Sequence, residues 1–387
     1  MSSPLVGIIA NPASGRDIRR LVAHGTVFDN NEKTAIVRRV LLGLEAVGMR
    51  RVAYMPEHDF GILPRALTEL QGHPLQLAAE PLEMPVLGTS ADSTRAAQLL
   101  AEMGAGCIIT LGGDGTNRVV AKGCGAVPLV PISTGTNNVF PTFLEGTVAG
   151  MAAGLVARGC TGEGALRRVP RLEVRVNGVP KDSALVDVVV SEQPFVGTRA
   201  IWDQALVREV VLARVAPATI GLSALGGALL STQIHAGNAA SASCESCLCC
   251  LCPPDSLPDS LPGSPADVSR DERKSSFAQP ARKENATVET SEPAGMHIIL
   301  GDGGREVMAA LAPGLIKWVG VRETRNLQVD DVVQFQPGTG TVALDGEREI
   351  ELIMTSVVEV RLCADGPFVV DVPAALEEAA HAGHFYR

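Results

Sequence analysis

Three short apolar segments near the start of the chain each end in a loop of glycine, hydroxyl and amide residues. The segments span 5–10, 106–111 and 127–132, and helical patterns lie between them at 32–47 and 94–103. Strands that alternate with helices at this spacing predict a parallel sheet covered by helices on both faces. Since the carboxyl ends of parallel strands meet at one edge of a sheet, we expect the three loops to converge there.

The middle loop follows a buried strand and opens a helix. It reads Gly112-Gly113-Asp114-Gly115-Thr116-Asn117. Its glycines allow the backbone N–H groups to approach a polyphosphate, and the start of the next helix adds partial positive charge. Asp114 would repel phosphate unless Mg²⁺ or a hydroxyl donor lies between them, so it is the candidate catalytic residue. A simple turn, in which Asp114 binds its own backbone, is the alternative.

The other two loops favour the nucleotide interpretation over chance turns. The first reads Asn11-Pro12-Ala13-Ser14-Gly15-Arg16, and its arginine would offset phosphate charge. The third reads Ser133-Thr134-Gly135-Thr136-Asn137-Asn138. The candidate nucleotide-binding residues are Asn11, Ser14, Gly15, Arg16, Gly112, Gly113, Gly115, Thr116, Asn117, Gly135, Thr136, Asn137 and Asn138.

From about residue 171 the pattern changes to strands separated by turn residues, which predicts a second, β-rich domain. The expected strands are 172–176, 184–191, 207–213, 334–336, 340–344 and 350–360. We expect a strand at 51–55 in the first domain, Asp92 or Ser93 as the cap of the helix at 94, and a helix at 374–382.

A polar stretch rich in Pro, Ser and Cys interrupts the β-rich region at 236–295 and is predicted to be a disordered insert. The predicted domains are therefore 1–165 (α/β), 166–235 with 296–365 (β-rich), and a tail at 366–387 that packs back on the first domain.

Five cysteines crowd into residues 244–252 of the insert. Two Cys-x-x-Cys pairs there are a potential zinc site, but a single residue separates them, which is too short to wrap an ion. We favour a cysteine-rich tip of a variable insert and predict no metal site formed by protein ligands alone. The string Gly301-Asp302-Gly303-Gly304 echoes the nucleotide loop and is interpreted as a turn.

Charge and hydropathy exclude several classes of function. The net charge is −10, with 46% hydrophobic and 20% charged residues. An acidic chain of this kind disfavours nucleic-acid and membrane-surface binding. No apolar run reaches the roughly 18 residues of a membrane span, and a cytoplasmic location is expected. Whether the chain forms a homo-oligomer stays open.

In order and spacing, the three loops resemble those of the superfamily that contains NAD kinases and the diacylglycerol and sphingosine kinases. The fuller string from Gly7 to Arg20, with Gly113-Asp114-Gly115-Thr116-Asn117-Arg118, is similar to the acetoin catabolism protein X family, an NAD kinase-like branch. The resemblance implies an α/β nucleotide domain of the NAD kinase and phosphofructokinase type, a β-rich second domain and a cleft between them. It also implies ATP and Mg²⁺ as cofactors, and a small hydroxyl acceptor with NAD as first choice.

The acceptor end departs from the NAD kinase pattern. Where NAD kinases carry an Asn-Glu pair, this chain carries Val186-Asp187, so the amide is absent and a carboxylate remains. Asp345 and Glu347 resemble an Asp-Gly-Glu segment of the lipid-kinase relatives that faces the cleft, although Asp345-Gly346 also fits a tight hairpin turn. Asp187, Asp345 and Glu347 are thus candidate acceptor residues. The alternatives to a kinase acting on NAD are a nucleotide-binding accessory protein of acetoin catabolism without turnover, and a diacylglycerol kinase-like lipid kinase.

Overall fold

The computed structural model describes residues 3–14, 24–26, 28–72, 75–192, 206–239, 294–335 and 338–386. Two compact units are present, one formed by 1–233 with 293–387 and the other by 234–292. Apart from 234–239 at the end of α6, the second unit lies outside the described residues. Its helices are α1 (Asn30–Ala46), α2 (Ile62–Glu69), α3 (Ser90–Glu102), α4 (Asp114–Ala121), α5 (Gly146–Ala157), α6 (Leu222–Ala239) and α7 (Val372–His381).

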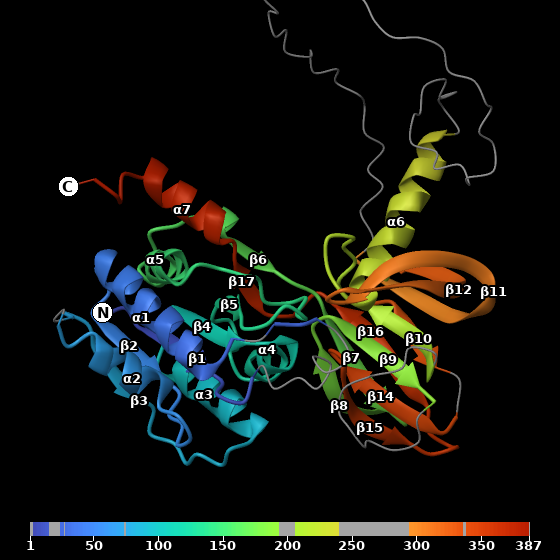
Figure 1. Cartoon of the computed structure of the whole chain (residues 1–387), viewed down its shortest axis with the longest axis horizontal. Helices are drawn as coiled ribbons and strands as arrows, with labels where there is room; N and C mark the ends of the chain where they lie inside the picture. The colour runs from blue at the N-terminus through green and yellow to red at the C-terminus, as the bar shows by residue number, and fades with distance from the viewer. Residues whose placement is uncertain are drawn as a thin grey trace, which may run out of the picture. The chain divides into compact units, whose positions relative to one another are not determined.

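A seven-stranded sheet carries the three glycine loops, with strand order β3-β2-β1-β4-β5-β17-β6 (Figure 1). Its strands are β1 (Val6–Ala10), β2 (Arg51–Tyr54), β3 (Ala78–Pro81), β4 (Cys107–Gly112), β5 (Leu129–Ser133), β6 (Leu166–Arg168) and β17 (Phe368–Val370). All neighbours are parallel except β6 and β17. The order reverses between β1 and β4, and such a switch point is where open α/β sheets bind ligands.

Helices cover both faces of this sheet because alternate strand residues point in opposite directions. On β1, Val6 and Ile8 belong to a core shared with α1, α2, α5 and α7. Ile9 belongs to the opposite core, with α3 and α4. Close packing of α1 on α5 requires small residues: a Cβ at Gly150 would lie 2.3 Å from the Val40 carbonyl oxygen.

The remaining strands form two antiparallel sheets. The six-stranded sheet has the order β12-β11-β10-β9-β14-β15 and the four-stranded sheet the order β13-β16-β7-β8. The strands are β7 (Arg171–Val176), β8 (Val179–Ala184), β9 (Asp187–Ser191), β10 (Val207–Leu212), β11 (Gly295–Ala312), β12 (Leu315–Leu327), β13 (Val332–Phe335), β14 (Gly340–Leu344), β15 (Glu347–Leu352) and β16 (Val358–Cys363). Alternate residues of both sheets, such as Val174 and Val190, fill one core between them, and α6 packs on the other face of the larger sheet.

This arrangement confirms the predicted fold class, a parallel α/β sheet with a β-rich second part. The C-terminal segment joins the first sheet through β17, and Ala375 and Ala379 of α7 enter its core. Strand β6 also belongs to this sheet, although the sequence assigned residue 166 onward to the β-rich domain. The exact domain limits stay a prediction.

Three local predictions of strands, turns and caps need correction. The segment 350–360 is two strands, β15 and β16, in different sheets. The string 301–304 is not a turn between strands but an irregularity inside β11, where the pairing slips opposite Val321. The N-cap of α3 is Thr89, because the helix begins four residues earlier than expected; Asp92 lies in its first turn and accepts the Thr89 N–H.

The predicted insert is shorter than 236–295 at both ends, because α6 continues to Ala239 and β11 starts at Gly295. Residues 240–293, with the cysteine cluster, lie outside the described residues. No described helix is long and apolar enough to cross a membrane.

Candidate functional site

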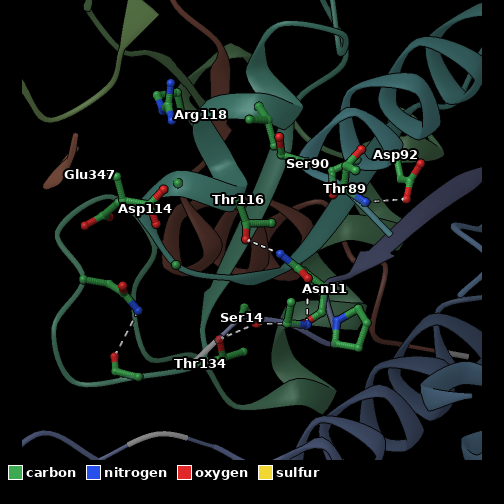
Figure 2. Close-up of a pocket in the computed structure, with 18 of the residues that line it drawn as sticks. Asn11, Ser14, Thr89, Ser90, Asp92, Asp114, Thr116, Arg118, Thr134 and Glu347 are labelled. Carbon is green, nitrogen blue, oxygen red and sulfur yellow. Dashed lines mark hydrogen bonds between the residues drawn. The ribbon is translucent and has the colours of Figure 1, made fainter. Parts of the chain in front are cut away.

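The three glycine loops meet because the strands that precede them end at the same level. Ala10 of β1 pairs with Leu111 of β4, and Gly112 of β4 pairs with Ser133 of β5. Two hydrogen bonds then join the loops directly (Figure 2). Asn11 Nδ2 donates to Thr116 Oγ1 over 3.0 Å, and the hydroxyls of Ser14 and Thr134 are 3.2 Å apart. The convergence predicted from the sequence is therefore present.

A cavity of about 690 Å³ lies at this junction. The predicted residues that line it are Asn11, Ser14, Gly113, Asp114, Gly115, Thr116, Gly135, Thr136, Asn137, Asn138, Asp345 and Glu347. Residues 55–59 and 86–90 line a further part of it, and sequence reasoning missed them. Their only sequence signal is that they follow β2 and β3, whose carboxyl ends lie at the same edge of the sheet.

Asp114 is the first residue of α4 and is held by the two residues that follow the third loop. Its carboxylate accepts the N–H of Phe140 over 2.7 Å and the N–H of Val139 over 3.0 Å. Arg214 stacks 4.4 Å above the Phe140 ring. Burial lowers the pKa of Arg214 to about 10, while the nearby Asp114 carboxylate raises it. Asp114 thus has a fixed orientation and a cationic neighbour behind it.

Three of the predicted site residues do not line the cavity. Asn117 is fully buried and accepts from the Thr110 hydroxyl over 2.7 Å, so it fixes the loop and does not line the cavity. Gly112 also lies behind the cavity wall, where its missing side chain makes room for Thr116. Asp187 is buried and accepts the Gly346 N–H over 3.3 Å, away from the cavity. Gly15 and Arg16 lie outside the described residues.

Asp345 forms a tight turn and also faces the cavity, the two alternatives that its sequence left open. Asp345 and Gly346 form the tight turn between β14 and β15 with positive φ values of 52° and 77°. The Asp345 side chain also borders the cavity and accepts the N–H groups of Leu185 and Val186 over 2.9 and 2.8 Å. Burial and the neighbouring Asp187 raise the pKa of Asp345 well above its ordinary value, against the lowering effect of Arg118.

Arg118 connects the helix that follows the middle glycine loop to the Asp345 side of the cavity, and it was not among the predicted site residues. Its guanidinium donates to Asp182 and to Glu349, each over 2.9 Å, and its Nε lies 3.8 Å from Asp345. The arginine side chain is 4% exposed. Burial alone lowers the pKa of Arg118, but the surrounding carboxylates raise it above its ordinary value. One cation on α4 therefore connects to both antiparallel sheets.

Lys33 binds the backbone of the first glycine loop. This residue of α1 is 1% exposed, and its ammonium donates to the carbonyl oxygens of Asn11 and Ser14 over 2.9 and 2.7 Å. A charged donor that binds several carbonyls fixes the loop's shape more firmly than neutral bonds do.

Lys33→Met is expected to lower the free energy of unfolding by about 2 kcal/mol, since buried carbonyls lose a charged donor. Urea unfolding measures this effect. Lys181→Met, at an exposed position on β8, is the control and should leave the midpoint unchanged. Equal midpoints for Lys33→Met and the wild type would show that the loop does not depend on Lys33.

Among the described residues, no group of three His, Cys, Asp or Glu side chains is arranged to hold a metal ion by itself. The free cysteines of the described chain, Cys107, Cys124, Cys160 and Cys363, do not line the cavity.

Two family models match separate parts of this chain. Residues 6–160 match the ATP-NAD kinase N-terminal domain, and residues 170–247 with 284–365 match the acetoin catabolism protein X C-terminal domain. Two solved structures of a proposed diacylglycerol kinase from Bacillus anthracis str. Sterne are similar at 13% and 12% identity, with TM-scores of 0.36 and 0.35. They cover 95% and 96% of this chain, and 97% and 98% of their own length.

A curated relative is similar over nearly its whole length. Acetoin catabolism protein X of Cupriavidus necator is 33% identical over 393 aligned residues, which cover 99% of this chain and 94% of the relative. On that identity and coverage, the chain belongs to the acetoin catabolism protein X family.

Proposed function

We propose that this protein is an ATP-dependent phosphotransferase that moves the γ-phosphoryl group of ATP to a hydroxyl of a small acceptor. Mg²⁺ is the proposed metal, and NAD is the first acceptor to test. The observation that carries the proposal is the meeting of three cross-bonded loops around one oriented carboxylate, Asp114. Catalysis of phosphoryl transfer depends on positioning and charge neutralisation by the protein more than on covalent chemistry.

The described residues fit a nucleotide. Gly113 is the N-cap of α4, and a Cβ there would lie 2.8 Å from Asn138 Oδ1, so glycine keeps this approach open. The hydroxyl groups of Ser14, Thr116 and Thr134 face the same cavity. Together with the positive end of α4, they suit phosphate oxygens. Bound ATP would supply the transferable phosphoryl group, and its Mg²⁺ would neutralise phosphate charge.

The hydrogen bonds of Asp114 bear on its role. Two backbone N–H groups fix the orientation of this carboxylate. A carboxylate held in this way suits the orientation of Mg²⁺ on the phosphates. Removal of the acceptor's hydroxyl proton is the second role proposed for it.

NAD as acceptor is supported by the match to ATP-NAD kinases and opposed by the second-domain residues. Val186 is 2% exposed and packs with Phe140 and Leu185, and neither it nor Asp187 lines the cavity. The contacts that the resemblance implied for NAD are thus missing from these positions. This observation favours a second candidate function, in which the protein binds nucleotide as an accessory protein of acetoin catabolism and catalyses no reaction.

The test is ADP formation by the purified full-length protein with Mg²⁺ and ATP. Separate reactions contain NAD, NADH, acetoin or a diacylglycerol, and one contains no acceptor. ADP formed only with NAD, together with NADP, supports the proposal in full, and ADP with another acceptor supports the kinase and replaces NAD. Binding of ATP without ADP formation in any reaction would favour the accessory role.

A further inference from the structure

The turn of the long β11–β12 hairpin forms part of the cavity wall. Pro313 and Gly314 connect the two strands, and Pro313 lines the cavity beside the glycine loops. The hairpin belongs to the six-stranded sheet (orange in Figure 1) and is the longest strand pair of the described chain. A second part of the β-rich region thus reaches the site, apart from the Asp345 turn.

This turn makes a close contact with the segment that leads into α1. The N–H of His24 donates to the Pro313 carbonyl oxygen over 2.9 Å. Gly314 has a φ of +73°, and a Cβ at this position would lie 2.7 Å from Cδ2 of His24. Both the backbone conformation and the space beside His24 therefore require glycine.

The same segment is bonded to the third glycine loop. The Thr26 N–H donates to Thr136 Oγ1 over 2.8 Å, and the Thr136 N–H donates back to the Thr26 carbonyl over 3.0 Å. Phe28 adds a bond from its N–H to the Thr134 carbonyl over 3.2 Å. Thr134 in turn contacts Ser14 of the first loop. A continuous series of bonds runs from the hairpin turn to two of the three loops.

We propose that the Pro313–Gly314 turn positions the 134–138 loop for nucleotide binding, acting through His24 and Thr26. This inference rests on the proposed nucleotide site and deepens it, because it makes a hairpin of the β-rich region a determinant of nucleotide affinity. A loop that is held in its bound shape before the ligand arrives loses less conformational entropy on binding. Pro313, Gly314 and His24 are positioning residues in this scheme.

The test compares two glycines of the same hairpin in the full-length protein. Gly314→Ala places a Cβ against His24, whereas Gly303→Ala, at a φ of +85°, meets no atom within 4 Å. Both variants carry the strain of alanine at positive φ, so both lose some stability. We expect Gly314→Ala to bind Mg·ADP about tenfold more weakly by calorimetry, while Gly303→Ala binds like the wild type.

Hydrogen exchange without nucleotide gives a second readout. The N–H groups of Thr136 and Phe28 are expected to exchange faster in Gly314→Ala only. Their hydrogen bonds depend on the position of the segment that contains His24 and Thr26, which the hairpin turn contacts. The double variant Gly314→Ala/His24→Ala removes the ring that the new Cβ meets, and most of the lost affinity should return.

The outcomes separate this inference from the proposed function. If the wild type binds Mg·ADP and the two glycine variants behave alike in both measurements, the positioning role is wrong and the nucleotide site stands. If hydrogen exchange at Thr136 rises only in Gly314→Ala but neither the wild type nor any variant binds nucleotide, the positioning of the 134–138 loop by the hairpin turn is supported and the proposed function fails. A double variant as weak as Gly314→Ala would show that contact with His24 is not the cause.

Discussion

Asp114→Asn is expected to reduce phosphoryl transfer by about 10²–10⁴-fold, the range typical for loss of one proton-transferring or charge-organising group. The substitution keeps the size of the side chain, and the amide oxygen can still accept the Phe140 N–H that Asp114 accepts. What is lost is the negative charge that would orient Mg²⁺ or take the hydroxyl proton. The measurement is kcat for ADP formation with saturating Mg·ATP and whichever acceptor supports turnover.

A matched control separates the role of charge in the cavity from the role of an acid at a helix start. Asp371 caps α7 by accepting the Ala374 N–H over 3.1 Å and does not line the cavity. Asp371→Asn should therefore keep kcat within about twofold, since its carboxylate touches no ligand. Asp114→Asn with wild-type kcat and an unchanged melting temperature would remove Asp114 from the mechanism.

The parallel sheet and its loops could be predicted because their signals are local. A buried apolar run followed by glycine marks both a strand and the edge at which it ends, so Asn11, Asp114 and Asn138 could be assigned to one site from spacing alone. Asn117 shows the limit of that reasoning. Its position three residues after Asp114 turns its side chain back toward Thr110, although its residue type matches the ligand-binding amides.

The strand boundaries that were predicted wrongly lie where the amino-acid composition does not change between strand and turn. Between β15 and β16 the chain turns at residues 353–357, where Ser356 accepts the Ile353 N–H, yet apolar and β-branched residues continue through the turn. Conversely, the glycines at 301 and 303 have the composition of a turn but adopt positive φ inside a strand. Gly and Asp indicate a local backbone conformation that occurs both in turns and in strand irregularities. Pairing with β12 determines that this segment is an irregularity inside a strand.

The partners of Arg118 could not be found from the sequence, because they are separated from it by 64 and 231 positions. Arg118 follows the middle glycine loop directly, and nothing in the neighbouring sequence indicates that it pairs with Asp182 and Glu349. This cluster, formed by Arg118, Asp182, Glu349 and Asp345, is also where we expect the largest effect on stability.

Arg118→Met should lower the free energy of unfolding by about 3 kcal/mol, because removal of one partner leaves buried carboxylates without their cation. We take the lower end of the usual range since Asp182 and Glu349 are 17% and 24% exposed and gain some hydration. Urea unfolding of the full-length protein measures the loss. Arg175→Met, which breaks the more exposed pair with Glu173, should cost less than about 1 kcal/mol.

A triple variant tests whether uncompensated charge is the cause. Arg118→Met combined with Asp182→Asn and Glu349→Gln removes the cation and its two closest carboxylates together and leaves only Asp345 of the cluster. Removal of both partners of a buried ion pair costs less than removal of one. Most of the lost stability should therefore return in the triple variant. If it stays as unstable as Arg118→Met alone, the arginine acts through the packing of its side chain between α4 and the two sheets, and the electrostatic explanation is wrong. The same variants then report on the site, because Arg118 lines the cavity and its loss should weaken nucleotide binding even where stability has been restored.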